Sequence, residues 1–463
     1  MFSVSTYKER RKKLSSLVKQ GVILLLGNNE SPMNYPANTY SFRQDSTFLY
    51  FVGLDIPEIA VMIDIDNQKT TLYGNDVGIE DIIWTGTLPS MSERASLTGI
   101  ENVKPFSELE KDVKKAMASK QTVHFTPPYR HDNMILLSDM LNIPINNLKT
   151  VASMELIRAI VMLRSIKDKD EIAHLDDIQQ YGYEMHVTAM KMAQEGMHEQ
   201  KIAGIIEGIA LQYGARVSFP TILSKHGEIF HNHHHNHILK KGDLMLCDAG
   251  FESNLGYATD HTRTTPVGGT FTQQQREIYE IVLSAKNKAF EMAKPGVYYR
   301  DIHLQASKVI AEGLKALGLM KGDVNEAVDA GAHALFFPHG LGHMMGLDVH
   351  DMEDLGENHI GYDTTIQRSD QFGLSYVRMA RKLQAGFVIT DEPGIYFIPE
   401  LIELWKSEHK LENFINYSKL ESYLTFGGIR LEDDVLITDT GSRLLGEKRI
   451  PITVDEVYHT VTK

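Results

Sequence analysis

The first 150 residues alternate short apolar runs with polar or amphipathic stretches. The apolar runs have the length of strands, and the stretch 106–118 carries apolar residues at helical spacing. Strands that alternate with helices are typical of an α/β domain. The predicted strands are 21–27 (GVILLLG), 48–54 (FLYFVGL), 59–66 (IAVMIDID), 69–74 (KTTLYG) and 121–125 (QTVHF).

A long helical pattern runs from about residue 153 to 196 and is interrupted between 165 and 169. The acidic sequence DKDE at 168–171 is typical of a helix N-terminus, so we expect one helix to end and another to begin here. A chain of 463 residues is also too long for one ordinary core. We predict an N-terminal α/β domain at 1–155 and a second domain at 156–463.

Beyond residue 196, helical patterns at 271–296 and 301–318 are interleaved with runs typical of strands. This mixture predicts an α+β domain with antiparallel strands. The predicted strands are 244–250, 256–265, 385–391 and 428–438.

The run 244–264 predicts a β-hairpin that brings two carboxylates together. Asp248 and Asp260 are equally far from Asn254, which lies among turn-forming residues. Residues symmetric about a hairpin turn face each other at about 5 Å, where like charges repel. A shared proton or a divalent cation would offset this repulsion, and the remaining alternative leaves both carboxylates in water. Because Asp248 directly follows an apolar strand, we favour the proton or the cation.

The composition narrows the classes of function. A formal net charge of −14 disfavours nucleic acid as a partner, and no apolar stretch approaches the roughly 20 residues of a membrane span. The single cysteine, Cys247, leaves no disulfide framework within the chain. We therefore expect a cytoplasmic protein without a membrane partner. Five of the 20 histidines lie in the run HNHHHNH at 231–237.

A second cluster of histidines lies in 338–351 (PHGLGHMMGLDVHD). His339, His343 and His350 fall within twelve residues, but the glycines around them do not suit the helical HExxH zinc motif. One histidine alone would more often be an ordinary core or surface residue. Three of them beside acidic residues favour a catalytic site.

Two predicted strands end in acidic residues. Glu392 follows an apolar run and precedes a Pro-Gly turn, where a carboxylate can face a central site. Arg430 and Glu432 lie two residues apart, so on a strand both would point to one face. The alternative for each is a solvated surface group or surface ion pair.

Five segments in a fixed order resemble the pita-bread (creatinase/aminopeptidase-like) metallopeptidases, specifically the Xaa-Pro dipeptidases (prolidases) and the aminopeptidases P. The similarity extends over nearly the whole chain. It implies an α/β N-terminal domain followed by an α+β pita-bread catalytic domain. The segments are 42–58 (FRQDSTFLYFVGLDIPE), 248–264 (DAG…ATDHTRT), 339–351 (HGLGHMMGLDVHD), 391–397 (DEPGIYF) and 428–435 (GIRLEDDV).

The resemblance selects metal ligands that the residues alone do not single out among 61 acidic side chains. It implies that Asp248, Asp260 and Glu432 hold one divalent ion. The ligands that it implies for a second ion are Asp260, His343, Glu392 and Glu432, so that Asp260 and Glu432 bridge. Two such ions activate water and stabilise the oxyanion of peptide hydrolysis. Mn(II) is implied, with Co(II) or Zn(II) as alternatives, and the low number of soft ligands agrees with Mn(II).

The resemblance also implies roles for residues around the metals. Glu392 would shuttle a proton to the proline nitrogen, and His231 and His350 would help to stabilise the oxyanion. His339 falls at a substrate-binding histidine of the family.

The two family activities differ in how they recognise the substrate carboxylate. Prolidases cut dipeptides, and Arg378 stands where they carry an arginine; with Arg430 it would bind the free carboxylate. The segment 399–428 also resembles prolidases, whereas the interval between residues 231 and 248 matches aminopeptidases P better. We expect hydrolysis of Xaa-Pro dipeptides, with aminopeptidase P activity on longer peptides as the alternative. A metal-free pita-bread binding module is a remote alternative. Homodimers are common in prolidases, so we expect one here, with a small peptide that has proline second as substrate.

Overall fold

The computed structural model describes residues 1–463, and the chain divides into two compact units. The first comprises residues 1–165 and 352–359, and the second comprises 166–351 and 360–463. The division follows α8 (Met154–Ser165) and precedes α9 (Lys169–Met192), which confirms the predicted break in the helical pattern. Asp168 causes α9 to start here, because its side chain accepts the N–H groups of the first turn.

A five-stranded mixed sheet in the order β6-β5-β4-β1-β7 forms the centre of the first unit. Val22 and Leu24 on β1 pack into one core with Leu109 and Val113 of α5 (Leu109–Ala118). The amphipathic helix predicted within 106–118 is therefore confirmed. The strands of this unit are β1 (Val22–Leu26), β2 (Pro32–Tyr35), β3 (Asn38–Thr39), β4 (Ala60–Asp64), β5 (Lys69–Tyr73), β6 (Asn102–Lys104) and β7 (Val123–His124).

The prediction of a strand at 48–54 is wrong, because α2 (Ser46–Phe51) occupies most of this run. The Asp45 side chain accepts the N–H of Phe48 at 2.7 Å and so caps the helix. All six residues of α2 are buried, and a helix buried on every side shows no helical period in its sequence. The other helices of the first unit are α1 (Val4–Val18), α3 (Ile79–Thr85), α4 (Met91–Ser96), α6 (His131–Leu141) and α7 (Leu148–Val151).

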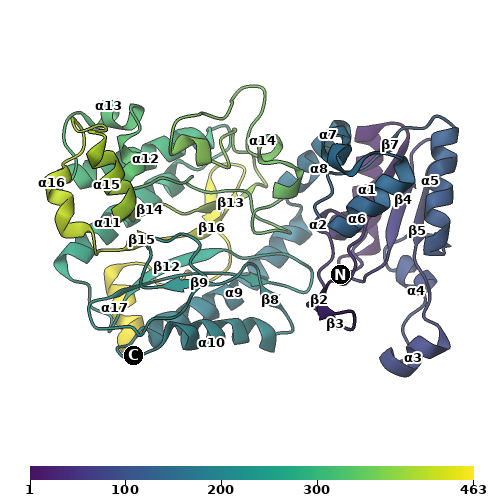
Figure 1. The fold of residues 1–463 in the computed structure, drawn as a ribbon, viewed down its shortest axis with the longest axis horizontal. Coiled ribbons are helices and arrows are strands. Elements are labelled where there is room, and N and C mark those ends of the chain that lie inside the picture. The colour runs from purple at the N-terminus through teal and green to yellow at the C-terminus, as the bar shows by residue number, and fades with distance from the viewer. The chain divides into compact units, whose positions relative to one another are not determined.

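The second unit contains short antiparallel sheets between helices, as the sequence predicts. The helix α9 packs against β10 and β12, and α11 (Gln273–Met292) packs against β13 and β15 (Figure 1). The strands are β8 (Arg216–Val217), β9 (Ile222–Ser224), β10 (Leu244–Ala249), β11 (Phe251–Glu252), β12 (His261–Pro266), β13 (Val388–Asp391), β14 (Gly394–Tyr396), β15 (Gly428–Arg430), β16 (Asp433–Ile437) and β17 (Ser442–Leu444). The remaining helices of this unit are α10 (Glu199–Gln212), α12 (Tyr299–Ala316), α13 (Val324–Asp329), α15 (Pro399–Ser407), α16 (Tyr417–Leu420) and α17 (Val454–Thr462). The short helix α14 (Glu357–Ile360) belongs almost entirely to the segment 352–359 of the first unit. No helix combines the length and apolar character needed to cross a membrane.

The predicted hairpin forms from β10 and β12, but its register differs from the prediction. Asp248 lies opposite Thr262, whereas Asp260 precedes β12 and lies outside the ladder. The cause is the turn, which is centred on Leu255 and not on Asn254: the Ser253 N–H donates to the Tyr257 carbonyl, and Glu252 of β11 bridges Ala258. The shift is two residues, and side chains alternate with a period of two, so Asp260 remains on the same face as Thr262. The two aspartates therefore share a face without facing each other.

Candidate metal centre

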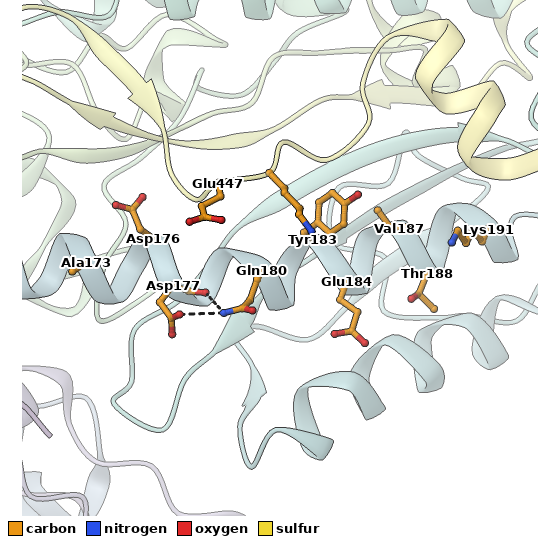
Figure 2. A pocket seen from close by; sticks show the side chains of 11 residues that line it. Ala173, Asp176, Asp177, Gln180, Tyr183, Glu184, Val187, Thr188, Lys191 and Glu447 are labelled. Atoms are coloured by element: carbon orange, nitrogen blue, oxygen red, sulfur yellow. Dashed lines mark hydrogen bonds between the residues drawn. The ribbon is translucent and has the colours of Figure 1, made fainter. Parts of the chain in front are cut away.

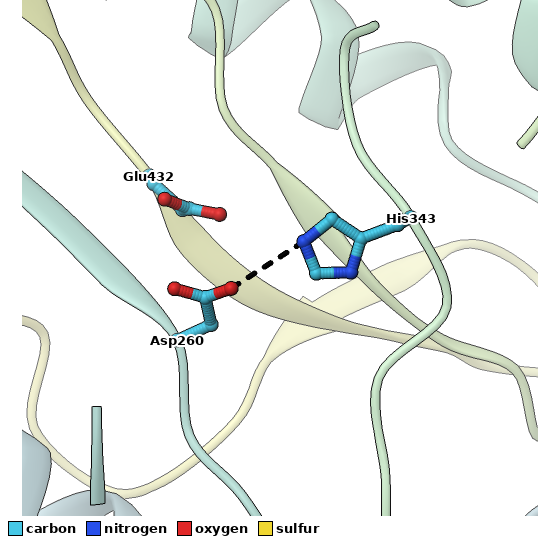
Figure 3. A group of neighbouring side chains, drawn as sticks. All are labelled: Asp260, His343 and Glu432. Carbon is cyan, nitrogen blue, oxygen red and sulfur yellow. Dashed lines mark ion pairs between the residues drawn. The ribbon is translucent and has the colours of Figure 1, made fainter. Parts of the chain in front are cut away.

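Three side chains from distant parts of the chain converge in the second unit. Oxygen or nitrogen atoms of Asp260, His343 and Glu432 all lie within 4.8 Å of one another, and all three residues are buried (Figure 3). His343 Nε2 is 3.4 Å from Asp260 Oδ2. Two of them lie next to strand ends, Asp260 before β12 and Glu432 between β15 and β16, whereas His343 lies in the loop segment 338–351.

The segment 338–351 is held against β13 by its backbone. Thr390 and His343 exchange hydrogen bonds, because the Thr390 N–H donates to the His343 carbonyl and the His343 N–H donates to Thr390 Oγ1. Gly342 permits this approach, since a Cβ there would lie 2.1 Å from the Thr390 carbonyl oxygen. The glycines that exclude a regular helix thus bring His343 to the strand.

The tautomer of His343 suits a metal ligand. Its Nδ1 lies 3.0 Å from the Met344 carbonyl, and a carbonyl can only accept, so Nδ1 carries the proton. Nε2 then presents a lone pair toward Asp260 Oδ2 and toward Glu392 Oε1, which is 3.8 Å away. A lone pair facing carboxylate oxygens is stable only with a cation or an extra proton between them.

Asp248 forms a buried ion pair with Arg430. The guanidinium donates to Asp248 Oδ2 at 2.5 Å, to the Tyr396 hydroxyl at 3.0 Å and to Thr262 Oγ1 at 3.1 Å. Thr262 in turn donates to Glu432 Oε2 at 2.7 Å. These bonds fix two candidate ligands through one buried arginine. They also occupy three N–H groups of Arg430, which was predicted to bind the substrate carboxylate with such groups.

Burial makes the ionised carboxylates unstable in the absence of a cation. It raises the pKa of Asp260 and of Glu432 well above their usual values, and the neighbouring carboxylates add to the shift. Burial likewise raises the pKa of Glu392 to about 8. Asp248 Oδ1 and Asp260 Oδ1 are buried and have no hydrogen-bond partner. Since unpartnered oxygens of this kind are the ligands that hard divalent ions prefer, the residues fit a metal centre.

The predicted histidines surround these residues. His339 donates from Nδ1 to the Gly340 carbonyl and accepts the Tyr396 hydroxyl at Nε2, and burial lowers its pKa to about 3. The ring of His350 lies 4.4 Å from that of His343. His231 remains largely exposed to solvent. Its pKa is lowered, first because the surrounding protein covers part of the side chain and second because of the positive charge of Arg430.

Arg378 is half-buried, and its positive charge acts on Glu392 by lowering the pKa of that carboxyl. Of the two arginines predicted to bind the substrate carboxylate, it is therefore the more accessible. The segment 399–428, which resembles prolidases in sequence, contains α15 and α16.

A charged layer behind the candidate ligands escaped the sequence analysis. Lys286 of α11 lies with Nζ 2.9 Å from Asp433 Oδ2 and 3.6 Å from Asp391 Oδ2. Arg263 Nη2 lies 2.6 Å from Asp433 Oδ1. The two aspartates are cross-strand partners on β13 and β16, and each directly neighbours a candidate ligand in sequence. Their adjacency to those ligands was a usable signal, whereas nothing in the pattern of α11 indicated Lys286.

A surface hollow along α9 shares no residue with the candidate metal centre. Its volume is about 730 Å³, and Figure 2 shows α9 side chains on one side with Glu447 opposite. Asp176 is already engaged by Arg443 and by the Gly446 N–H. This hollow therefore has a polar, partly paired lining and lacks the converging ligands described above.

Two family models match the chain. The model of metallopeptidase family M24 matches residues 173–439, which include every candidate metal ligand. The model of the aminopeptidase P N-terminal domain matches residues 7–124, within the first unit. The matches confirm the expected order of an N-terminal domain and a pita-bread catalytic domain.

Individual relatives cover almost the whole chain. The "probable Xaa-Pro aminopeptidase PEPP" of Podospora anserina is 32% identical over 450 residues, with 95% of this chain and 94% of that protein covered. The human "Xaa-Pro dipeptidase" is 31% identical over 461 residues, with 97% and 90% covered. Zinc-substituted aminopeptidase P of E. coli, solved in complex with product, has a TM-score of 0.82 at 27% identity and covers 99% of this chain and 98% of its own.

Proposed function

We propose that this chain, which belongs to metallopeptidase family M24, hydrolyses the Xaa-Pro bond of dipeptides. The observation that carries the proposal is the buried convergence of Asp260, His343 and Glu432 within the matched region. The lone pair of His343 Nε2 faces carboxylate oxygens there, an arrangement that calls for cations. The names of the two relatives supply the substrate class, a peptide with proline second.

We assign two divalent ions to the centre. Asp248, Asp260 and Glu432 would hold one ion. The ligands of the second would be Asp260, His343, Glu392 and Glu432. When bound, such a pair supplies a Lewis acid that activates water and stabilises negative charge on the scissile carbonyl. Mn(II) suits a set with four carboxylates and one imidazole, and Co(II) or Zn(II) are the alternatives.

The side chains around the ligands would orient the peptide and move its proton. Glu392, with a pKa raised to about 8 by burial, can carry a proton near neutral pH and deliver it to the proline nitrogen. His350, beside His343, and His231 would donate to the developing oxyanion. His339 is neutral and fixed by Tyr396, so it can present its ring to the substrate without a charge.

Dipeptide specificity would rest mainly on Arg378. The Arg378 side chain is half-buried, and its charge lowers the pKa of Glu392. A residue that pairs with the substrate carboxylate next to the scissile bond must lie close to Glu392 in this way. For Arg430 to bind the substrate carboxylate as well, it must use N–H groups other than those that bond to Asp248, Tyr396 and Thr262.

Aminopeptidase P activity on longer peptides is the second candidate. The engagement of Arg430 favours it, because one accessible guanidinium provides a weaker clamp for a dipeptide carboxylate than two.

Proline release from Gly-Pro, compared with release of the first residue from a tripeptide Xaa-Pro-Xaa, distinguishes the candidates. We expect the higher kcat/KM with Gly-Pro, and Arg378→Ala should lower it for the dipeptide more than for the tripeptide. A preference of the unaltered protein for the tripeptide would overturn the dipeptidase assignment.

Three further expectations accompany the proposal. Mn(II) should give the highest activity after metal removal, and protein without bound Mn, Co or Zn would support the metal-free binding module. We also propose a homodimer, which sedimentation tests, and a cytoplasmic location, which fractionation of the source cells tests.

A further inference from the structure

Two histidines outside the candidate metal centre lie side by side at the two ends of one loop. His226 follows β9, and His237 precedes Ile238, which bridges back to His198 before α10. The centroids of the two imidazole rings are 4.8 Å apart, and the rings are tilted by 58°. Their side chains are 42% and 37% exposed, so both can be reached from solvent.

A fully buried carboxylate orients His237. Glu199, the first residue of α10, lies with Oε2 at 3.0 Å from His237 Nδ1. The same carboxylate accepts the N–H groups of Lys225 at 2.8 Å and His237 at 3.1 Å, and the Ser224 hydroxyl at 3.3 Å. This contact favours the tautomer with the proton on His237 Nδ1, in which Nε2 carries the lone pair.

A second carboxylate orients His226 in the same way. Glu228 Oε1 lies 2.9 Å from His226 Nδ1, so the proton again lies on Nδ1. The other oxygen, Glu228 Oε2, is buried without a hydrogen-bond partner. A carboxylate oxygen therefore lies 3.0 Å or less from each Nδ1, which leaves Nε2 of each ring as the nitrogen available to bind an ion.

We propose that His226 and His237 form a separate binding site for a borderline divalent transition ion such as Zn(II), coordinated by both Nε2 atoms and by water. Imidazole suits Zn(II), Ni(II) and Cu(II) better than Mn(II) or Mg(II). Histidine ligands commonly donate their other N–H to a carboxylate, which fixes the ring and increases its basicity; here both histidines have this partner. The site shares no residue with the carboxylate-rich centre.

The ion would close a loop that borders the candidate metal centre. Residues 227–236 lie between the two ligands and include Phe230 and His231. The Phe230 ring lies 4.5 Å from the ring of Tyr396 and 5.4 Å from that of His339. Fixing both ends of this loop lowers its conformational freedom, so ion binding should stabilise the wall that Phe230 forms.

Calorimetric titration of Mn(II)-saturated protein with Ni(II), in the presence of excess Mn(II), tests the site. We expect one equivalent with an affinity reduced roughly 10- to 100-fold or more by His226→Gln or by His237→Gln, and about 10-fold by Glu228→Gln. The matched control is His409→Gln, since His409 has a similar carboxylate partner, Glu412 at 3.0 Å, but no second ring beside it. This control should leave the titration unchanged.

A second measurement makes the result independent of folding defects. Cu(II) bound to Mg(II)-saturated protein should give an electron paramagnetic resonance spectrum with two equatorial nitrogens, and one or none in the single variants. The same Ni(II) affinity in the double variant His226→Gln/His237→Gln would overturn the proposal. Loss of binding in His233→Gln/His234→Gln alone would also overturn it, because the ion would then occupy the neighbouring histidines.

Discussion

Replacing Lys286 by methionine should destabilise the second unit strongly, although Lys286 contacts no candidate metal ligand. Its side chain is 4% exposed and pairs with Asp433 at 2.9 Å and Asp391 at 3.6 Å. Without the ammonium, Asp391 keeps neither a cation nor a hydrogen bond, because both of its oxygens lack hydrogen-bond partners. Removing one partner of a buried pair costs about 3–5 kcal/mol, which for a unit of this size lowers Tm by on the order of 10 °C.

The control for this variant lies on the same helix. Lys288 pairs with Glu291 at 3.0 Å on the surface, and an exposed pair contributes at most about 1 kcal/mol. Thermal unfolding of Lys286→Met, Lys288→Met and the unaltered protein, each saturated with Mn(II), measures the difference. Equal melting temperatures for the two variants would refute the view that Lys286 holds β13 and β16 together. Asp391→Asn added to Lys286→Met should recover part of the loss, since it removes the uncompensated charge.

Three further predictions follow from the same contacts. Glu392→Gln should abolish Xaa-Pro hydrolysis and leave the circular dichroism spectrum unchanged, because it removes the group that carries the proton; residual turnover above a few per cent would contradict that role. Thr262→Val should weaken metal affinity roughly 10-fold in a chelator competition assay, because Glu432 Oε2 and Arg430 Nε lose their shared partner. Burial lowers the pKa of His333 to about 4, so its protonation favours the unfolded state and stability falls as pH drops below about 6.5. At pH 5 this costs about 2 kcal/mol, and urea unfolding of His333→Leu should show that much less loss between pH 7.5 and 5.

Local signals in the sequence predicted much of the fold. The break at 165–169 was predictable because the Asp168 cap acts within one helical turn. The run 48–54 was not, because burial of α2 on all sides removes the helical period. The hairpin register was also missed, because the turn-forming residues point to Asn254, whereas the backbone reverses about Leu255, with the Ser253 N–H bonded to the Tyr257 carbonyl.

The candidate site shows the same division between local and distant determinants. The shared face of Asp248 and Asp260 could be predicted from one run of residues, although their register could not. His343 approaches Asp260 only because the segment around Gly342 lies against β13, a contact between residues far apart in sequence. Arg430 was predicted to bind substrate, whereas in the fold it donates hydrogen bonds to Asp248, Tyr396 and Thr262, which only the folded arrangement reveals.

The charges of this region together favour two divalent ions over one. Seven carboxylates and four cationic side chains leave three negative charges, more than one divalent ion can balance. The carboxylates are Asp248, Asp260, Asp391, Glu392, Glu432, Asp433 and Asp434, and the cations are Arg263, Lys286, Arg378 and Arg430. Protonation is the other means of relieving the excess, in agreement with the raised pKa values that burial gives Asp260, Glu392 and Glu432. Metal binding should therefore release protons and strengthen as pH rises, because each ligand must lose its proton first. Calorimetric titrations with Mn(II) in two buffers of different ionisation enthalpy measure this release, and identical heats in both would show that the centre is already deprotonated without its ions.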